Sequence, residues 1–290
     1  MAYGVNAPFG LRPMSSITGG SWTEKVNEYY IFTDANGANS YNTSIFTGDP
    51  VVFTPTAANI TGNPNVGGFI TRYIPNLTVA QPSTFSALPL LGVFVGCEYT
   101  SVVNGTNSLV KSAFWPAGTA VVPGTLIKAY VIDDPNVVYD VQVSTSTNAV
   151  NNAFVASPTF PNVNVTAANL TGAFGSNFAL NIGGGTNFNT VVNAYTTATG
   201  NTYASNPANG STLTGQSAFY LDVNTTTAAG ADRDYSKLVV TLPLKVVGWT
   251  QHPSNIAATG LTQATTPFLN VRVLINNHVY GHNVLGTTLA

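Results

Sequence analysis

Three histidines, His252, His278 and His282, are the side chains best suited to metal binding or acid–base chemistry. His278 and His282 lie in one short stretch that has no helical pattern. In a strand, residues i and i+4 share a face but lie about 13 Å apart, so one metal ion cannot bind both. Only a turn at Gly281 would bring them together. We therefore predict no metal site, and we expect His278 to be a hydrogen-bonded structural residue.

Clustered carboxylates are the next residues that could do chemistry. Asp133, Asp134 and Asp140 flank the pair Pro135-Asn136. Oxygen-rich loops of this kind can bind calcium, but the ligand spacing of a calcium loop is absent. Aspartate before proline and asparagine is also common turn chemistry, which we favour. Asp222, Asp232 and Asp234 lie further along the chain and have the same character. No sequence context singles out any two of these carboxylates as the catalytic pair of a glycoside hydrolase.

Motifs for nucleophilic catalysis, phosphate binding, dinucleotide binding or zinc binding are absent. The run Gly183–Gly185 lacks the lysine and the strand-to-helix context of a phosphate loop. Cys97 is the single cysteine, so no internal disulfide can form. It lies in a strand-like run, and we predict a buried, inert thiol. The sequence therefore predicts no catalytic residue, no cofactor-binding residue and no cofactor.

The composition is unusually poor in charge. Only 7% of the 290 residues are Asp, Glu, Lys or Arg, whereas about 25% is ordinary. No apolar run approaches the roughly 20 residues that cross a bilayer, and the few dispersed basic residues form no patch for phosphates. We expect neither a membrane nor a nucleic acid as partner. Polarity comes from Asn, Thr, Ser and Gly, a neutral surface that suits packing against other proteins.

Short β-type runs alternate with turn residues along most of the chain, and no window has sustained helical periodicity. This pattern predicts an all-β protein with a β-barrel or sandwich core. The strongest strand candidates are Glu28–Phe32, Val51–Phe53, Leu90–Gly96, Thr119–Val122, Leu126–Ile132, Val137–Val143, Ser217–Val223, Leu238–Leu244, Lys245–Trp249 and Asn270–Asn276.

Composition changes divide the chain into four ranges. We expect an extended N-terminal arm at 1–23, a barrel-like core at 24–143, and a loop-rich β insertion or small subdomain at 144–216. Residues 217–290 return to β-type runs, which complete the core or form a second β domain. The insertion is rich in Asn, Thr and Gly, and we expect it to face outward, where it could bind a glycan.

The N-terminal range contains spaced hydrophobic residues and no regular periodicity. An arm of this kind can lie on a neighbouring subunit or add a strand to its sheet. We predict that Phe9, Leu11 and Trp22 anchor the arm in such a contact. The first seven residues lack the cationic and apolar segments of a secretion signal, so we expect synthesis and assembly in the cytoplasm.

Several segments resemble virion structural proteins of tailed bacteriophages, and in particular their small β-barrel head decoration (cement) proteins. The segments that carry the resemblance are Ala7–Pro13, Thr47–Phe53, Leu91–Gly96, Trp115–Val122, Leu242–Gly248 and Val273–His278. The resemblance implies a non-enzymatic protein on the capsid exterior. Its partners would be the phage major capsid protein and further copies of itself, often as a homotrimer.

The motif Gly48-Asp49-Pro50 has a structural explanation within that resemblance. Gly48 permits a turn, and the Asp49 carboxylate can accept a hydrogen bond from the turn backbone. Pro50 fixes φ at the start of a strand, where no ladder donor is needed. These residues would shape a barrel rather than react with a substrate.

Two other classes of function stay open at this stage. One is a different virion component, either a tail fibre or a major capsid protein, although neither repeats nor a long helix are visible. The other is a carbohydrate-binding module or depolymerase, with Trp115, Trp249 and Tyr280 as sugar-stacking candidates. Core packing is the more common role for such aromatic residues.

Overall fold

A computed structural model describes residues 9–31, 43–53, 68–73, 89–144, 177–182, 210, 214–222, 243–250 and 270–281. These residues form 12 β-strands and no helix, which confirms the all-β prediction. Within these ranges, no helix is long and apolar enough to span a bilayer.

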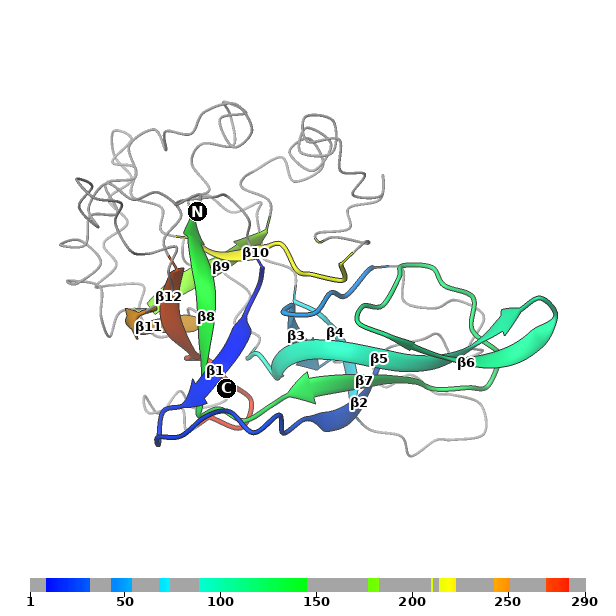
Figure 1. Ribbon diagram of the computed structural model, residues 1–290, viewed down its shortest axis with the longest axis horizontal. Coiled ribbons are helices and arrows are strands. Elements are labelled where there is room, and N and C mark those ends of the chain that lie inside the picture. Colours follow the sequence, from blue (N-terminus) through cyan, green and yellow to red (C-terminus); the bar gives the residue numbers. More distant parts are fainter. Residues whose placement is uncertain are drawn as a thin grey trace, which may run out of the picture.

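The first of two sheets contains strands from both ends of the chain. Its order is β1-β8-β10-β9-β11-β12, and a further pairing between β8 and β12 closes the sheet from β8 to β12 into a ring. We call this ring, together with β1 paired to β8, the first barrel. Its strands are β1 (Arg12–Ser16), β8 (Val137–Ser144), β9 (Asn177–Ile182), β10 (Phe219–Asp222), β11 (Leu244–Trp249) and β12 (Asn270–Ile275). Figure 1 shows them together on one side of the molecule.

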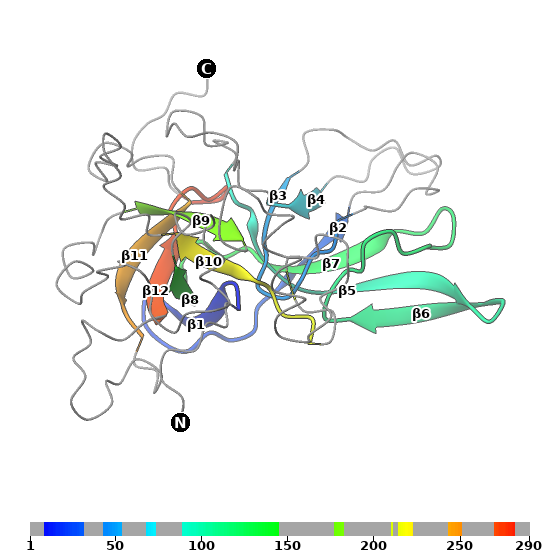
Figure 2. The ribbon, with the colours of Figure 1, turned by 90° about the horizontal axis from the view of Figure 1, so that it is seen from above.

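The second sheet has the order β3-β4-β2-β7-β5-β6, and a pairing between β3 and β5 closes it in the same way. We call it the second barrel. Its strands are β2 (Asn27–Ile31), β3 (Pro50–Phe53), β4 (Phe69–Arg72), β5 (Gly92–Val103), β6 (Thr106–Ser112) and β7 (Ile127–Ile132). The ends of β5 and β6 extend beyond this ring as a long hairpin (Figures 1 and 2).

The hairpin turn follows from its two central residues. Asn104 and Gly105 both have positive φ angles, 51° and 76°. Two consecutive left-handed residues match the twist of the flanking strands, and asparagine followed by glycine adopts this geometry at low cost. The turn therefore fixes the register in which Val103 lies opposite Thr106.

Alternating burial explains why the β-type runs become barrel strands. In β7, Ile127, Ala129 and Val131 are buried, whereas Lys128 and Tyr130 between them are half-buried. This is the two-residue period of a strand that has one face on a core. Strand β8 instead has buried side chains at every position from 137 to 143. Val137, Tyr139, Val141 and Val143 pack in the core of the first barrel, and the positions between them include the buried polar residues Asp140 and Gln142.

The core of the first barrel extends to strands of the second barrel. Val93 and Ile132 belong to strands of the second barrel, yet they pack in the hydrophobic cluster that fills the first. Residues 133–136 form the direct link from β7 to β8. At this point Gly92 lies so close to the chain that a β-carbon would sit 2.1 Å from the Ile132 carbonyl oxygen. Only glycine allows that approach.

The strands of the first barrel come from all four ranges that the composition suggested. Strand β1 lies in 1–23, most of β8 in 24–143, β9 in 144–216, and β10 to β12 in 217–290. Strand pairing over long sequence separations, rather than local composition, thus decides which segments share a sheet. The candidate strand Thr119–Val122 is instead irregular, and Val122 begins the turn that contains Pro123 and Gly124.

Candidate functional site

The turn at Gly48-Asp49-Pro50 lies where the barrels meet. Gly48 has φ of 93°, and Pro50 is the first residue of β3. The Asp49 carboxylate accepts a hydrogen bond from the Phe46 N–H at 2.8 Å, and the Asp49 N–H donates to the Phe46 carbonyl at 2.9 Å. Both interactions close the turn that leads into the strand.

The N-terminal segment docks directly on this turn. Leu11 N–H donates to the Gly48 carbonyl at 2.9 Å, and Gly10 N–H donates to the Phe219 carbonyl at 3.1 Å. Gly10 and Gly48 both have positive φ. A β-carbon at Gly48 would lie 2.7 Å from the Phe9 carbonyl oxygen, so the two segments fit together only without side chains here.

A buried ion pair lies beneath the turn. The Arg72 Nε atom is 2.8 Å from Asp49 Oδ2, and both side chains are almost fully buried. The Arg72 guanidinium also lies 5.8 Å from the Phe46 ring and 5.2 Å from the Phe219 ring. Phe219 belongs to β10, so this cation joins the first barrel to the second.

Burial controls the protonation of this pair. Desolvation raises the pKa of Asp49 to about 6, although Arg72, the Phe46 N–H and Ser217 each lower it. The carboxylate is therefore ionised at neutral pH and balances the buried arginine. The pair holds the turn before β3 against the end of β4, because breaking it would leave a buried charge without its counter-ion.

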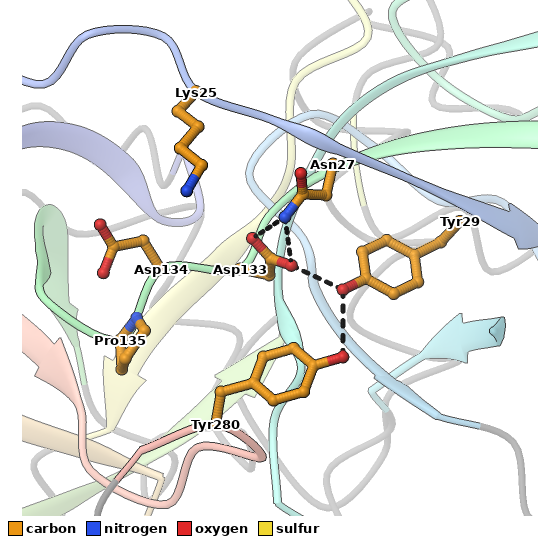
Figure 3. A pocket seen from close by; sticks show the side chains of 7 residues that line it. All are labelled: Lys25, Asn27, Tyr29, Asp133, Asp134, Pro135 and Tyr280. Carbon is orange, nitrogen blue, oxygen red and sulfur yellow. Dashed lines mark hydrogen bonds between the residues drawn. The ribbon is translucent and has the colours of Figure 1, made fainter.

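A shallow pocket of about 450 Å³ lies beside the link between β7 and β8 (Figure 3). Its walls come from three parts of the chain: strand β2 with Lys25 two residues before it, the link from β7 to β8, and the turn after β12. The lining residues are Lys25, Asn27, Tyr29, Asp133, Asp134, Pro135 and Tyr280.

Asp133 is the centre of the hydrogen bonds in this pocket. The Asn27 side-chain N–H group lies 2.8 Å from both carboxylate oxygens, and the Tyr29 hydroxyl donates to Oδ2 at 2.6 Å (Figure 3). The Tyr29 and Tyr280 hydroxyls are 3.3 Å apart. Burial, followed by the hydrogen bond to Asp133, raises the pKa of Tyr29 well above its ordinary value. Tyr29 therefore stays protonated as a donor, and Asp133 serves as a fixed acceptor.

His278 is buried beside this pocket. Its Nδ1 atom accepts a hydrogen bond from the Tyr280 N–H at 3.0 Å. Desolvation lowers the pKa of His278, and the nearby charges of Asp133 and Asp134 raise it by a smaller amount. The resulting pKa is about 4. The surrounding backbone holds it in place, because Leu90 N–H donates to Asn277 and Val279 N–H donates to Leu90. His278 is thus a neutral, hydrogen-bonded residue, which confirms the role expected from the sequence.

The carboxylates near Pro135 serve separate purposes. Asp134 Oδ1 accepts a hydrogen bond from the Asn136 N–H at 2.9 Å, which is turn chemistry. Asp140 is buried on β8, where it accepts from Thr250 at 2.6 Å and lies 3.7 Å from Arg12. In the described ranges, no three His, Cys, Asp or Glu side chains are placed to hold a metal. Outside those ranges lie His252, His282, Asp232 and Asp234, together with the side chain of Asp222.

The three predicted arm anchors have different environments. Leu11 is only 1% exposed and packs in the core of the first barrel. Trp22 is half-buried and packs against the same cluster. Phe9 is also half-buried, and the Arg12 guanidinium carbon lies 4.5 Å from the centroid of its ring. Strand β1 pairs with β8 of its own chain. Leu11 is therefore occupied within the chain, and contact of these anchors with a capsid or another subunit stays a prediction.

The aromatic residues considered for sugar stacking differ in their exposure to solvent. Trp115 is fully buried and packs edge-on against Tyr99, with ring centroids 5.2 Å apart. Tyr280 is 52% exposed at the pocket. The side chain of Trp249 lies outside the described part of the structure. Cys97 is buried, and desolvation raises its pKa to about 12, as expected of an inert thiol.

The sequence analysis did not predict the partners of Asp49 and Asp133. Arg72 contacts Asp49, and Asn27 and Tyr29 contact Asp133, only through the tertiary fold. Asn27 and Asp133, for example, are 106 positions apart. The available signal was a charged residue, Arg72, inside a β-type run of a chain with few charges.

Exposed apolar side chains gather on the hairpin of β5 and β6. Val102, Val103 and Leu109 are 57%, 47% and 62% exposed. Apolar residues of this size at the end of a projecting hairpin suit contact with another protein surface.

Comparisons with known proteins identify no relative. No protein-family model, curated protein or solved structure matches the chain.

Proposed function

We propose that this chain is a non-enzymatic capsid decoration protein of a tailed bacteriophage, which binds the outer capsid lattice and stabilises the head. The observation that carries the proposal is the exposed apolar hairpin, with Val102, Val103 and Leu109 projecting from a neutral all-β body. The sequence resemblance supplies the virion context.

The use of charge in the fold supports a structural role. The buried carboxylates Asp49, Asp133 and Asp140 all accept hydrogen bonds from the chain's own groups. Asp49 and Asp140 also lie next to arginines. Charges committed to internal contacts stabilise a scaffold, whereas a reaction centre needs a group that is available to a substrate.

A second exposed apolar region extends the contact surface that we propose. Met14 on β1 and Ile17 just after it are 40% and 54% exposed. They belong to the segment in which an intersubunit contact is predicted, and they are freer to contact a neighbour than the buried Leu11. On a capsid, they would add apolar burial to that of the hairpin.

The proposed mechanism is mass action. A protein that binds only the assembled, expanded shell stabilises that shell by the free energy of its binding. Many copies on a repeating lattice add their contributions, and linked copies gain further through avidity.

Copy number in purified phage particles tests the proposal, measured by quantitative mass spectrometry against the major capsid protein. A number in the hundreds, near one per capsid subunit, supports decoration. A number from a few to a few tens points instead to the tail or its fibres. Absence from the particles excludes a virion role.

A carbohydrate-binding role has one specific observation in its favour. Tyr280 is half-exposed in a pocket that also contains Lys25 and Asp134, and an aromatic ring beside polar groups can hold a sugar. Glycan-array binding of the wild type, lost in Tyr280→Ala, would support this second candidate. An array without hits would exclude binding of the glycans that it displays.

A further inference from the structure

The outer edge of strand β6 is open in the part of the chain that the structure describes. Strand β6 is last in its sheet and pairs only with β5. Figure 2 shows it at the outer margin of the molecule. Leu109 is 62% exposed, and the Lys111 side chain is 74% exposed. An uncovered edge of this kind is a template for a further strand.

Alternate residues of β6 direct their backbone groups to this outer edge. Leu109 lies opposite Thr100, whose carbonyl accepts a hydrogen bond from Val122 on the far side of β5. Thr100 and Leu109 therefore form a non-hydrogen-bonded pair, and the N–H and C=O of Leu109 point away from β5. By the same alternation, Asn107 and Lys111 present their backbone groups outward. None of the three has a backbone partner among the described residues.

These three residues are complementary to themselves. When two β6 strands lie antiparallel about a two-fold axis at Leu109, Leu109 faces Leu109 of the second copy. Asn107 of each copy then faces Lys111 of the other. All of these residues have outward backbone groups, so each pair can exchange both hydrogen bonds. Leu109 is also the midpoint of Thr106–Ser112, so this axis pairs the whole strand.

The side chains favour the same arrangement. Val102 lies opposite Asn107, so it is the diagonal neighbour of Leu109 on the same face of the hairpin. Two copies would bring Val102 and Leu109 into one continuous apolar row. Lys111 is 3.3 Å from Glu98 within its own chain, and it would face the neutral Asn107 of the other copy.

Charge disfavours a competing register. An axis at Lys111 would place two lysines opposite each other, which destabilises a strand pair. It would also pair only one end of the strand. The axis at Leu109 therefore has both the greatest overlap and no like charges opposite each other.

We propose that β6 is a docking edge for a second copy of this chain, paired antiparallel about a two-fold axis at Leu109. The contact joins two second barrels through one continuous sheet. It is a property of the free chain and holds whether or not the chain decorates a capsid.

Disulfide cross-linking of the full-length chain tests the register. In the paired state, the Cα atoms of directly opposite residues lie about 5.5 Å apart, within the range of a disulfide. Leu109→Cys is therefore expected to form a dimer of twice 30.2 kDa under mild oxidation. Cys97 is buried and should not contribute. Val103→Cys is the control, because Val103 is also exposed but lies on the other face of the hairpin beside the turn.

Mass measurement over a concentration series by light scattering gives the second test. The wild type is expected to dimerise, and Leu109→Lys, which places two lysines opposite each other, is expected to stay monomeric. Leu109→Pro should also be monomeric, since it removes an outward donor that β5 does not use. Val103→Lys should dimerise like the wild type. A monomeric wild type, equal cross-linking of the two cysteine variants, or an oligomer that Leu109→Lys leaves intact would overturn the proposal.

Discussion

The guanidinium of Arg72 and the carboxylate of Asp49 form a buried ion pair in the second barrel, with Nε 2.8 Å from Oδ2. Asp49 also closes the turn before β3, whereas Arg72 ends β4 and reaches Phe219 of the first barrel. One contact thus connects a local turn to the docking of two sheets. The stability of the whole fold should be sensitive to it.

Loss of the Arg72 charge is the first prediction. Arg72→Met should lower the free energy of unfolding at neutral pH by about 3–5 kcal/mol, because it leaves the Asp49 carboxylate buried without its counter-ion. Lys111→Gln, which removes the exposed partner of Glu98, should cost less than about 1 kcal/mol. Urea unfolding followed by tryptophan fluorescence measures both. Equal costs would show that burial does not govern the Asp49 pair.

Acid should destabilise the fold through His278. Its pKa is about 4 in the folded chain and about 6.5 when unfolded. The unfolded state therefore binds more protons between these values, so stability is fully present above pH 6.5 and falls as the pH drops towards 4. At about 1.4 kcal/mol per unit, the loss is at most roughly 3 kcal/mol.

The variant His278→Gln isolates this effect from Asp49. The raised pKa of Asp49, about 6, acts in the opposite direction: its contribution is present below its unfolded pKa near 3.8 and is lost as the pH rises through 6. Urea unfolding from pH 7.5 to 4 should show the stability advantage of wild type over variant shrinking with acid. A constant difference would mean that His278 does not titrate with unfolding.

Close packing at Gly48 gives a third prediction. Gly48→Ala must adopt a left-handed conformation and also place its methyl group against the Phe9 carbonyl. Gly19→Ala is the matched control, because Gly19 has a similar φ of 97° but open space around it. The control should cost about 1–2 kcal/mol, the ordinary left-handed penalty. Gly48→Ala should cost clearly more in thermal or urea unfolding, and equal costs would contradict tight docking of the N-terminal segment.

The tyrosine pair at the pocket gives a fourth prediction. Tyr29→Phe removes a buried donor to Asp133 and should cost about 1–3 kcal/mol, because the carboxylate loses a hydrogen bond where water is scarce. Tyr280 is a half-exposed residue whose hydroxyl lies 3.3 Å from that of Tyr29, so Tyr280→Phe should cost less than about 0.5 kcal/mol. A double-mutant cycle would show little coupling. If Tyr280→Phe were the costlier change, Asp133 would not be the centre of the hydrogen bonds in this pocket.

Local patterns predicted much of the secondary structure. The runs at Leu126–Ile132 and Val137–Val143 became β7 and β8 with boundaries within a residue or two, because alternating or continuous apolar residues need only their neighbours to favour a strand. The turn at Gly48 has the geometry that its residue types indicate for the same reason. Thr119–Val122 was wrong as a strand, since the turn at Val122–Thr125 begins at its end.

By itself, the sequence determined the all-β class, several strands and the turn chemistry, and it indicated a structural role for His278. These depend on composition and on short-range spacing. Only the tertiary structure decided that strands from both ends of the chain share one sheet, that Arg72 meets Asp49, and that Asn27 and Tyr29 meet Asp133. Tyr29 and Tyr280, 251 positions apart, lie side by side for the same reason. These pairings depend on the free energy gained when whole sheets pack together. A single segment contributes only a small part of that free energy, so its sequence alone does not identify its partner.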